Sequence, residues 1–270
     1  MENKIYNHAL NYLISHDSIS KQEIEKHLIP LHQKPNDFNI IFKRFCETAQ
    51  NKQMSVKVIG NSIGGVEKLS PILFDFNPHK VAAKYSSLDA FHLFEEIKLK
   101  LNPSGKVRDT KKSLWPLYCK TIIDSAHFLA NFKTINDFYE WAHFYTNDTR
   151  SKPALPLMIS IEISGIGFPL ACDFLKEIGF EEYGKPDVHI KEIFKALNII
   201  NPNEKSTLKQ DYEALKAMDR IAKLNNVSTY AVDKIFWLIG SGDFYRSNIK
   251  IGQNRSKFIE KVKSKIELLN

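Results

Sequence analysis

Residues 163–190 read Ile-Ser-Gly-Ile-Gly-Phe-Pro-Leu-Ala-Cys-Asp-Phe-Leu-Lys-Glu-Ile-Gly-Phe-Glu-Glu-Tyr-Gly-Lys-Pro-Asp-Val-His-Ile. The glycines at 165 and 167 allow a tight turn, and the residues after them are apolar at helical spacing, so we predict a helical hairpin. Such a turn at the start of a helix leaves backbone N–H groups that suit a phosphate. Asp187 follows Gly167 by 20 residues and opens a further predicted helix.

The hairpin has two readings. Ile163 and Ile166 would anchor the two helices, and Gly179 would end the second one as a C-terminal cap. In the functional reading, Gly165 and Gly167 leave room for the backbone of a ligand. In the structural reading, the turn is a connection between helices that only packs, and a bare Gly-x-Gly favours this second reading.

Asp187 also has two readings. The sequence Lys185-Pro186-Asp187 comes directly before a predicted helix, which makes the aspartate a natural N-terminal cap. We expect the helix N-terminus to keep its carboxylate ionised. An ionised carboxylate beside a sugar stabilises an oxocarbenium-like transition state or orients a water molecule. Capping and catalysis are compatible.

Outward from this segment, the pattern predicts a mainly α protein. One short N-terminal β-hairpin is expected from the alternating residues 54–59 and the turn signal at 60–65. Apolar spacing and capping residues predict helices elsewhere; their expected ranges are 2–16, 20–29, 38–50, from 77, 87–99, 113–129, 134–145, 153–161, 188–197, 205–224, 228–239 and 255–269.

We expect two parts along the chain. Residues 1–75 form a mostly helical N-terminal subdomain, either a cap or a small helix-turn-helix or winged unit. Residues 76–270 form a helical domain, which contains the hairpin at about 155–178 and the aspartate segment 185–190. A chain of 270 residues is long enough for one large domain or two modest ones.

Composition narrows the class of protein. With 43% hydrophobic residues and no run of about 18 apolar ones, we expect a globular protein without a membrane span. The first residues lack the layout of a signal peptide, so we expect a cytoplasmic protein. Cys46, Cys119 and Cys172 are few and far apart, which argues against disulfides, a four-cysteine metal site and an iron–sulfur cluster.

The charge is basic, with 38 Lys and Arg against 31 Asp and Glu, a formal net charge of +7. A positive field attracts nucleic acid, although many basic proteins bind none. Most of this charge is lysine, which fits phosphate neutralisation better than bidentate recognition of bases. Six basic residues are candidates for a DNA-facing surface, each with solvated surface charge as the simpler reading: Lys106, Arg108, Lys111, Lys112, Lys152 and Lys176.

Residues 163–190 resemble the helix-hairpin-helix DNA glycosylase superfamily. Ile163-Ser164-Gly165-Ile166-Gly167 is similar to the family hairpin Leu-Pro-Gly-Val-Gly, and Ala171 fits the small residue of its second helix. Pro186-Asp187-Val188-His189-Ile190 resembles the catalytic Val-Asp-x-His segment, and the spacing between the two motifs matches. The specific resemblance covers about 35 residues. It implies a helical fold of two subdomains, base flipping and cleavage of an N-glycosidic bond.

The resemblance implies roles for individual residues. Asp187 would be the catalytic residue that stabilises the sugar cation. The backbone of Gly165, Ile166 and Gly167 would bind a phosphate, and the resemblance also allows a monovalent cation at the hairpin carbonyls. No other cofactor or metal is expected. Further DNA-contact candidates are Phe168, which follows the hairpin, and Lys176 and Lys185.

Pro169 decides the expected reaction. Members of the family that also cleave the DNA strand carry a lysine two residues after the second hairpin glycine, where this chain has Pro169. Proline in a chain offers no amine for a Schiff base. The expected protein is therefore a monomeric, monofunctional glycosylase that hydrolyses a damaged or modified base from double-stranded DNA. The alternatives are a non-catalytic helix-hairpin-helix DNA-binding protein and a glycosylase for modified bases of foreign DNA.

Overall fold

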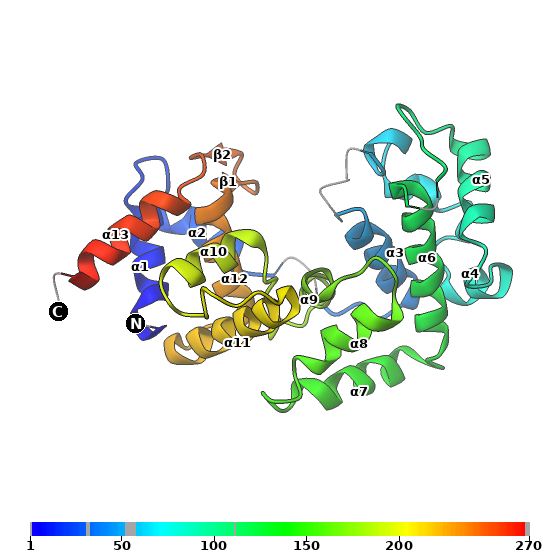
Figure 1. Ribbon diagram of the computed structural model, residues 1–270. Coiled ribbons are helices and arrows are strands. Elements are labelled where there is room, and N and C mark those ends of the chain that lie inside the picture. Colours follow the sequence, from blue (N-terminus) through cyan, green and yellow to red (C-terminus); the bar gives the residue numbers. More distant parts are fainter. Residues whose placement is uncertain (1, 31–32, 52–57, 111, 268–270) are drawn as a thin grey trace. The chain divides into compact units, whose positions relative to one another are not determined.

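The computed structural model describes residues 2–30, 33–51, 58–110 and 112–267 (Figure 1). Its described residues are mainly helical, which confirms the predicted fold class. Contacts divide the chain into two compact units: unit 1 is Met1–Leu31 with Gly179–Asn270, and unit 2 is His32–Ile178. The predicted boundary near residue 75 falls inside unit 2.

Unit 1 is built around α12 (Thr229–Ser241), which packs against helices from both ends of the chain. Its apolar residues are buried on every side, as expected of a central helix. Around it lie α1 (Glu2–Ile14), α2 (Lys21–Leu28), α10 (Val188–Ala196), α11 (Thr207–Asn225) and α13 (Arg255–Glu267).

A small antiparallel sheet follows α12. Strand β1 (Asp243–Phe244) pairs with β2 (Ile249–Lys250), so that Asp243 lies opposite Lys250 and Phe244 opposite Ile249. Gly242 ends α12 with φ +67°, and its N–H donates to the carbonyl of Leu238. A glycine with positive φ directly after the last helical residue, here Ser241, is a typical C-terminal cap.

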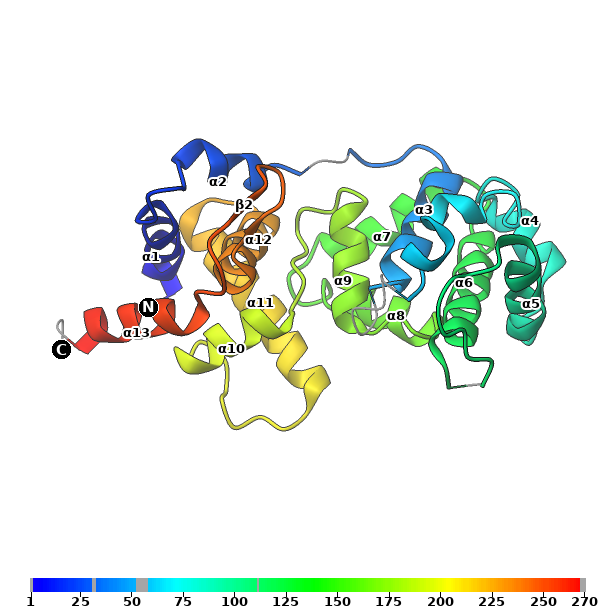
Figure 2. The same cartoon turned by 90° about the horizontal axis from the view of Figure 1, so that it is seen from above.

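Unit 2 is built around α6 (Leu114–Ala130), which packs against three helices (Figure 2). These are α3 (Phe38–Ala49), α4 (Pro78–Lys84) and α5 (Ala90–Leu101). The remaining helices are α7 (Ile135–Thr146), α8 (Ala154–Glu162) and α9 (Phe168–Glu177), where α8 packs on α7 and α9, and α9 packs on α3. A stacked ring pair joins α3 to α9, with the centroids of Phe45 and Phe174 3.6 Å apart.

Capping chemistry fixes most helix starts where the sequence predicts them. Thr134 forms a complete capping box with Asp137 at the start of α7. The helix expected over 87–99 begins three residues later than predicted, at Ala90, with Asp89 in the capping position. The carboxylate of Asp89 accepts from the N–H of Ser86 at 2.7 Å and holds the preceding turn instead.

The predicted N-terminal β-hairpin lies partly outside the described residues, since 52–57 are not described. From Val58 onward the described chain forms turns and the 3₁₀ helices η2 (Asn61–Ile63) and η3 (Val66–Leu69). Gly64 and Gly65 both have positive φ, which matches the predicted turn signal.

Candidate functional site

The predicted hairpin connects α8 to α9 in unit 2. Ile163 ends α8, and its carbonyl accepts a hydrogen bond from the N–H of Ile166 at 3.2 Å. Both isoleucine side chains are buried, as predicted for anchors of the two helices. Gly165 sits between them with φ +93°, a conformation that side chains rarely adopt. The fold itself therefore requires the first hairpin glycine.

The second hairpin glycine has no such explanation. Gly167 is the N-terminal cap of α9 with φ −79°, which any residue adopts, and it is exposed. A Cβ added there would meet nothing closer than the Cδ of Pro169 at 4.0 Å. Among the described residues, the N–H groups of Gly167 and Phe168 donate to no acceptor. Gly167 thus leaves an uncapped helix start open to a ligand.

The hairpin is held in place by α6. The hydroxyl of Thr121 donates to the carbonyl of Ser164 at 2.5 Å, and the carboxylate of Asp124 accepts from the N–H of Ser164 at 3.1 Å. Asp124 is buried and also pairs with Lys120. The sequence prediction missed both residues. The available signal was that both polar side chains lie on the mostly buried part of this helix.

We expect Asp124→Ala to loosen the hairpin. The substitution leaves the N–H of Ser164 without its partner and costs about 1–3 kcal/mol. Hydrogen exchange, measured by mass spectrometry on peptides covering 163–168, should become roughly tenfold faster, in line with that cost. Ser125→Ala is the matched control, because the Ser125 hydroxyl donates only within its own helix, to the carbonyl of Thr121. Equal exchange in both variants would contradict the role of Asp124.

Two of the predicted DNA contacts have buried side chains. Phe168 is 4% exposed and is the first residue of α9, so only its backbone N–H remains for a ligand. Lys176 is 5% exposed, and its ammonium lies 2.9 Å from the carboxylate of Asp173 one turn earlier. The apolar periodicity of α9 places both positions on its buried side.

Asp187 belongs to unit 1, together with Lys185, whereas the hairpin residues belong to unit 2. It is the N-terminal cap of α10, and its carboxylate accepts from the N–H of Ile190 at 3.0 Å, which confirms the predicted cap. The preceding segment lies directly on α11 and α12. A Cβ on Gly184 would be 2.8 Å from the sulfur of Met218 and 3.0 Å from the Cβ of Asp233.

Burial and a second acid act on Asp187 in addition to the helix N-terminus. Burial, followed by the neighbouring carboxylate of Asp233, raises the pKa of Asp187 above its ordinary value. The hydrogen bond from Ile190 and the charges of His189 and Lys185 oppose this rise. The sequence prediction considered only the helix N-terminus, which favours the ionised form. Burial and a neighbouring acid are also the usual causes of perturbed pKa values at acid–base sites.

His189 fixes α10 against the C-terminal part of unit 1. Its Nδ1 lies 3.4 Å from a guanidinium nitrogen of Arg255, and that guanidinium pairs with Glu192 at 2.5 Å. A Cβ on Gly240 would overlap the His189 side chain, so α12 approaches α10 closely at this glycine. These contacts give His189 a structural role and hold the helix that Asp187 caps.

The other basic candidates divide by exposure. Lys106, Arg108 and Lys112 are exposed, whereas Lys152 is buried. Lys111 lies outside the described residues. The three exposed cations lie together in the loop that precedes α6, where they line one cavity.

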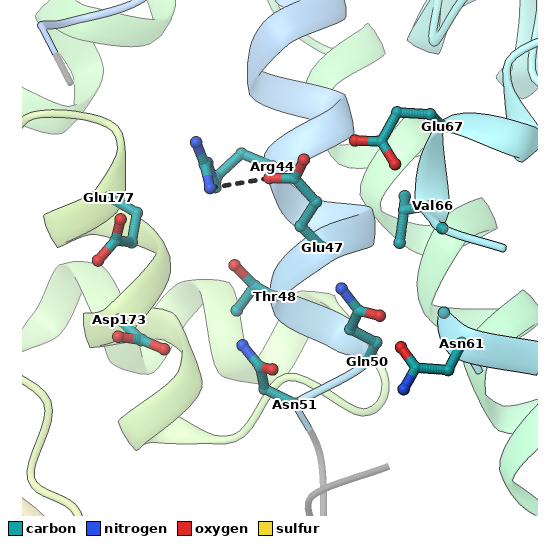
Figure 3. Close-up of a pocket in the computed structure, with 12 residues that line it drawn as sticks. Arg44, Glu47, Thr48, Gln50, Asn51, Asn61, Val66, Glu67, Asp173 and Glu177 are labelled. Atoms are coloured by element: carbon teal, nitrogen blue, oxygen red, sulfur yellow. Dashed lines mark ion pairs between the residues drawn. The ribbon is translucent and has the colours of Figure 1, made fainter. Parts of the chain in front are cut away.

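A cavity of about 470 Å³ opens between α3, the η2–η3 segment and α9 (Figure 3). Asp173 and Glu177 face it from α9, while Glu47 on α3 and Glu67 on η3 add two further carboxylates. The guanidinium of Arg44 pairs with Glu47 at 2.8 Å. Because carboxylates outnumber cations among the described lining residues, this cavity does not suit the phosphates of DNA.

Among the described residues, no group of three or more His, Cys, Asp or Glu side chains is placed to hold a metal ion. Nor does any described helix combine the length and apolar character needed to cross a membrane. Cys46, Cys119 and Cys172 are buried thiols.

Comparison with known proteins adds no assignment. No family model matches this chain, and no curated protein or solved structure matches it either.

Proposed function

We propose that this protein is a monofunctional DNA glycosylase. The observation that carries the proposal is the uncapped start of α9, where Gly167 is not required by the fold and leaves two N–H groups without an acceptor among the described residues. Phosphate oxygens are the ligands that such a helix start prefers. A net charge of +7 supports an anionic partner.

Asp187 supports the chemical step of the proposal. Its carboxylate is fixed by the N–H of Ile190 and is half-buried, so one of its oxygens is oriented while the group keeps some access to solvent. Near the C1′ atom of a flipped nucleotide, this carboxylate would stabilise the developing sugar cation and orient the attacking water. The bond between C1′ and the base nitrogen breaks, water supplies the new C1′–oxygen bond, and an abasic site remains.

Pro169 supports hydrolysis without strand cleavage. It is the second residue of α9, directly after the hairpin, and carries no amine. A Schiff base with the sugar, which strand cleavage by a lysine requires, therefore cannot form at this position.

The test is a panel of DNA duplexes that carry uracil, 8-oxoguanine, alkylated purines or modified cytosines. After incubation with the protein, we expect one class of duplex to break at the modified position only after alkali treatment. Breakage without alkali or amine would contradict the monofunctional reaction. Binding of a modified duplex without release of any base would favour the non-catalytic alternative, in which Asp187 serves only as a helix cap.

Gly167→Ala should separate binding from folding. Its Cβ meets open space, so the free energy of unfolding should change by less than about 1 kcal/mol, the difference between Gly and Ala as N-terminal caps. The methyl group would stand where a phosphate approaches the N–H groups, so duplex affinity should fall at least about tenfold, the loss of one or two charge-assisted hydrogen bonds. Fluorescence anisotropy and urea unfolding measure the two effects. Unchanged affinity would rule out the hairpin as the phosphate site.

The raised pKa of Asp187 predicts the pH dependence of base release. The carboxylate is the active form, so the rate should fall on the acid side with a midpoint above the ordinary aspartate value of 3.8. Asp233→Asn removes the like charge while keeping the shape of the side chain, and it should move that midpoint to lower pH. Asp211→Asn is the control, because Asp211 is a buried acid of unit 1 that pairs with Lys191. A midpoint that moves equally in both variants would contradict the coupling.

A further inference from the structure

A second candidate anion site lies at the start of α6, in unit 2. The loop before α6 and the first turn of that helix enclose a cavity of about 330 Å³. Its lining includes three cationic side chains and, among the described residues, no acidic one. The lining residues used below are Lys106, Arg108, Lys112, Ser113, Leu114 and Trp115.

The three cations form no ion pair among the described residues. Lys106, Arg108 and Lys112 are all exposed, and no acidic side chain of the described residues lines the cavity with them. Some other lysines of unit 2 are paired: Lys100 lies 2.7 Å from Glu96, and Lys84 lies 2.6 Å from the same residue. The cavity therefore keeps an uncompensated positive charge, which favours an anionic ligand.

The first turn of α6 adds backbone donors. Ser113 occupies the capping position, but its hydroxyl donates to the carbonyls of Arg108 and Thr110, at 2.6 and 2.7 Å, and does not cap the helix. The N–H groups of Leu114 and Trp115 find no acceptor among the described residues. The helix is 17 residues long, so its dipole favours negative charge at this end.

The indole of Trp115 is an independent indication of a ligand. Trp115 is only 2% exposed, and its Nε1 atom is buried without a hydrogen-bond partner among the described residues. An unpaired buried donor costs about 1–3 kcal/mol, so nearly all such donors in folded proteins have an acceptor. Trp115 lines the cavity, and its Nε1 atom is closed off from solvent in the unbound protein, so a shift of the side chain on ligand binding would be needed to bring this N–H to an acceptor.

We propose that this cavity binds a phosphate group, and that its ligand is a phosphodiester of the DNA backbone. The second part rests on the proposed function, because a DNA glycosylase must hold the duplex at several phosphates around one base. The donors are two lysine ammonium groups, the Arg108 guanidinium and backbone N–H groups, all of which bind phosphate oxygens. The site contributes affinity and position, independent of DNA sequence.

The first arm of the test asks whether the cavity binds phosphate. In the ¹⁵N-labelled protein, the indole N–H signal of Trp115 is assigned by its loss in Trp115→Phe. Adding inorganic phosphate, against chloride at equal ionic strength, should shift this signal to saturation and leave those of Trp141 and Trp237 in place. The shift should vanish in the variant K106A/R108A/K112A. An unmoved Trp115 signal, or the same shift in that variant, would overturn the site.

The matched control is K68A/K80A/K133A. Lys68, Lys80 and Lys133 are exposed lysines of unit 2 without an ion pair among the described residues, so this variant loses the same three charges elsewhere. It should keep the phosphate-dependent shift of Trp115. Loss of the shift in this control as well would mean that net charge alone causes the effect, and would overturn the site.

The second arm asks whether the phosphate belongs to DNA. The slope of log affinity for duplex DNA against log salt should fall by about two to three in K106A/R108A/K112A, close to one for each lost phosphate contact, and remain unchanged in the control. If phosphate shifts the Trp115 signal but the salt slope for duplex DNA is unchanged in K106A/R108A/K112A, the assignment of the ligand to DNA would be overturned. If the wild type binds no duplex at all, the proposed glycosylase function fails, while the indole result still decides whether the cavity binds free phosphate.

Discussion

Asp187→Asn should lower the rate of base release at least about 100-fold, the lower end of what a positioned acid–base group contributes. The reason is chemical, because an amide carries no negative charge to stabilise the sugar cation and cannot take a proton from water. Single-turnover release from the duplex identified by the panel measures this loss. Duplex affinity should stay within about threefold of wild type, since only an interaction made in the transition state is removed.

This substitution separates catalysis from capping. Asparagine caps a helix as well as aspartate does, so the N–H of Ile190 keeps its acceptor and α10 should remain folded. Asp37→Asn is the matched control, because Asp37 caps α3 in the same way through the N–H of Asn39 at 3.0 Å. Full activity of Asp187→Asn would leave the aspartate as a cap only and would favour the non-catalytic DNA-binding alternative.

Local features of the fold could be predicted from the sequence. Ile163 and Ile166 are buried and Gly179 has positive φ, because apolar spacing and glycine conformations act over a few residues. The same holds for the cap at Asp187 and the capping box at Thr134. These signals depend on chemistry within one or two helical turns.

The assembly of the units could not be predicted in the same way. Helix α1 packs against α11 and α12, and α2 packs against α12, although these partners lie about two hundred residues further along the chain. A single sequence shows which face of each helix is apolar but not which other helix covers it. The expected N-terminal subdomain of residues 1–75 therefore does not appear as one compact unit, and α3 packs in unit 2.

The candidate site shows the same limit. The pattern identified the hairpin and Asp187, but the residues that position them come from elsewhere in the sequence. Asp124 accepts a hydrogen bond from Ser164, which lies 40 residues later in the sequence, and Asp233 raises the pKa of Asp187, which lies 46 residues earlier.

The turn after α12 should be the most sensitive point of unit 1. Gly242 has φ +67°, and a Cβ there would overlap the carbonyl of Gly252, whose neighbour Ile251 donates its N–H to the carbonyl of Gly242 at 2.9 Å. In Gly242→Ala, backbone strain of about 1–2 kcal/mol adds to an overpacking cost of about 1–3 kcal/mol. We expect the free energy of unfolding to fall by about 3 kcal/mol or more, measured by urea unfolding.

Gly252→Ala isolates the steric part of this effect. Gly252 lies across the same turn with φ +73°, but a Cβ there would meet nothing within 4 Å. It should therefore lose only the strain of about 1–2 kcal/mol. Equal losses in the two variants would show that the carbonyl of Gly252 moves away at no cost. A larger loss in Gly242→Ala would mean that the close approach of the two backbones holds the end of α12, the helix that carries Asp233 and packs against His189.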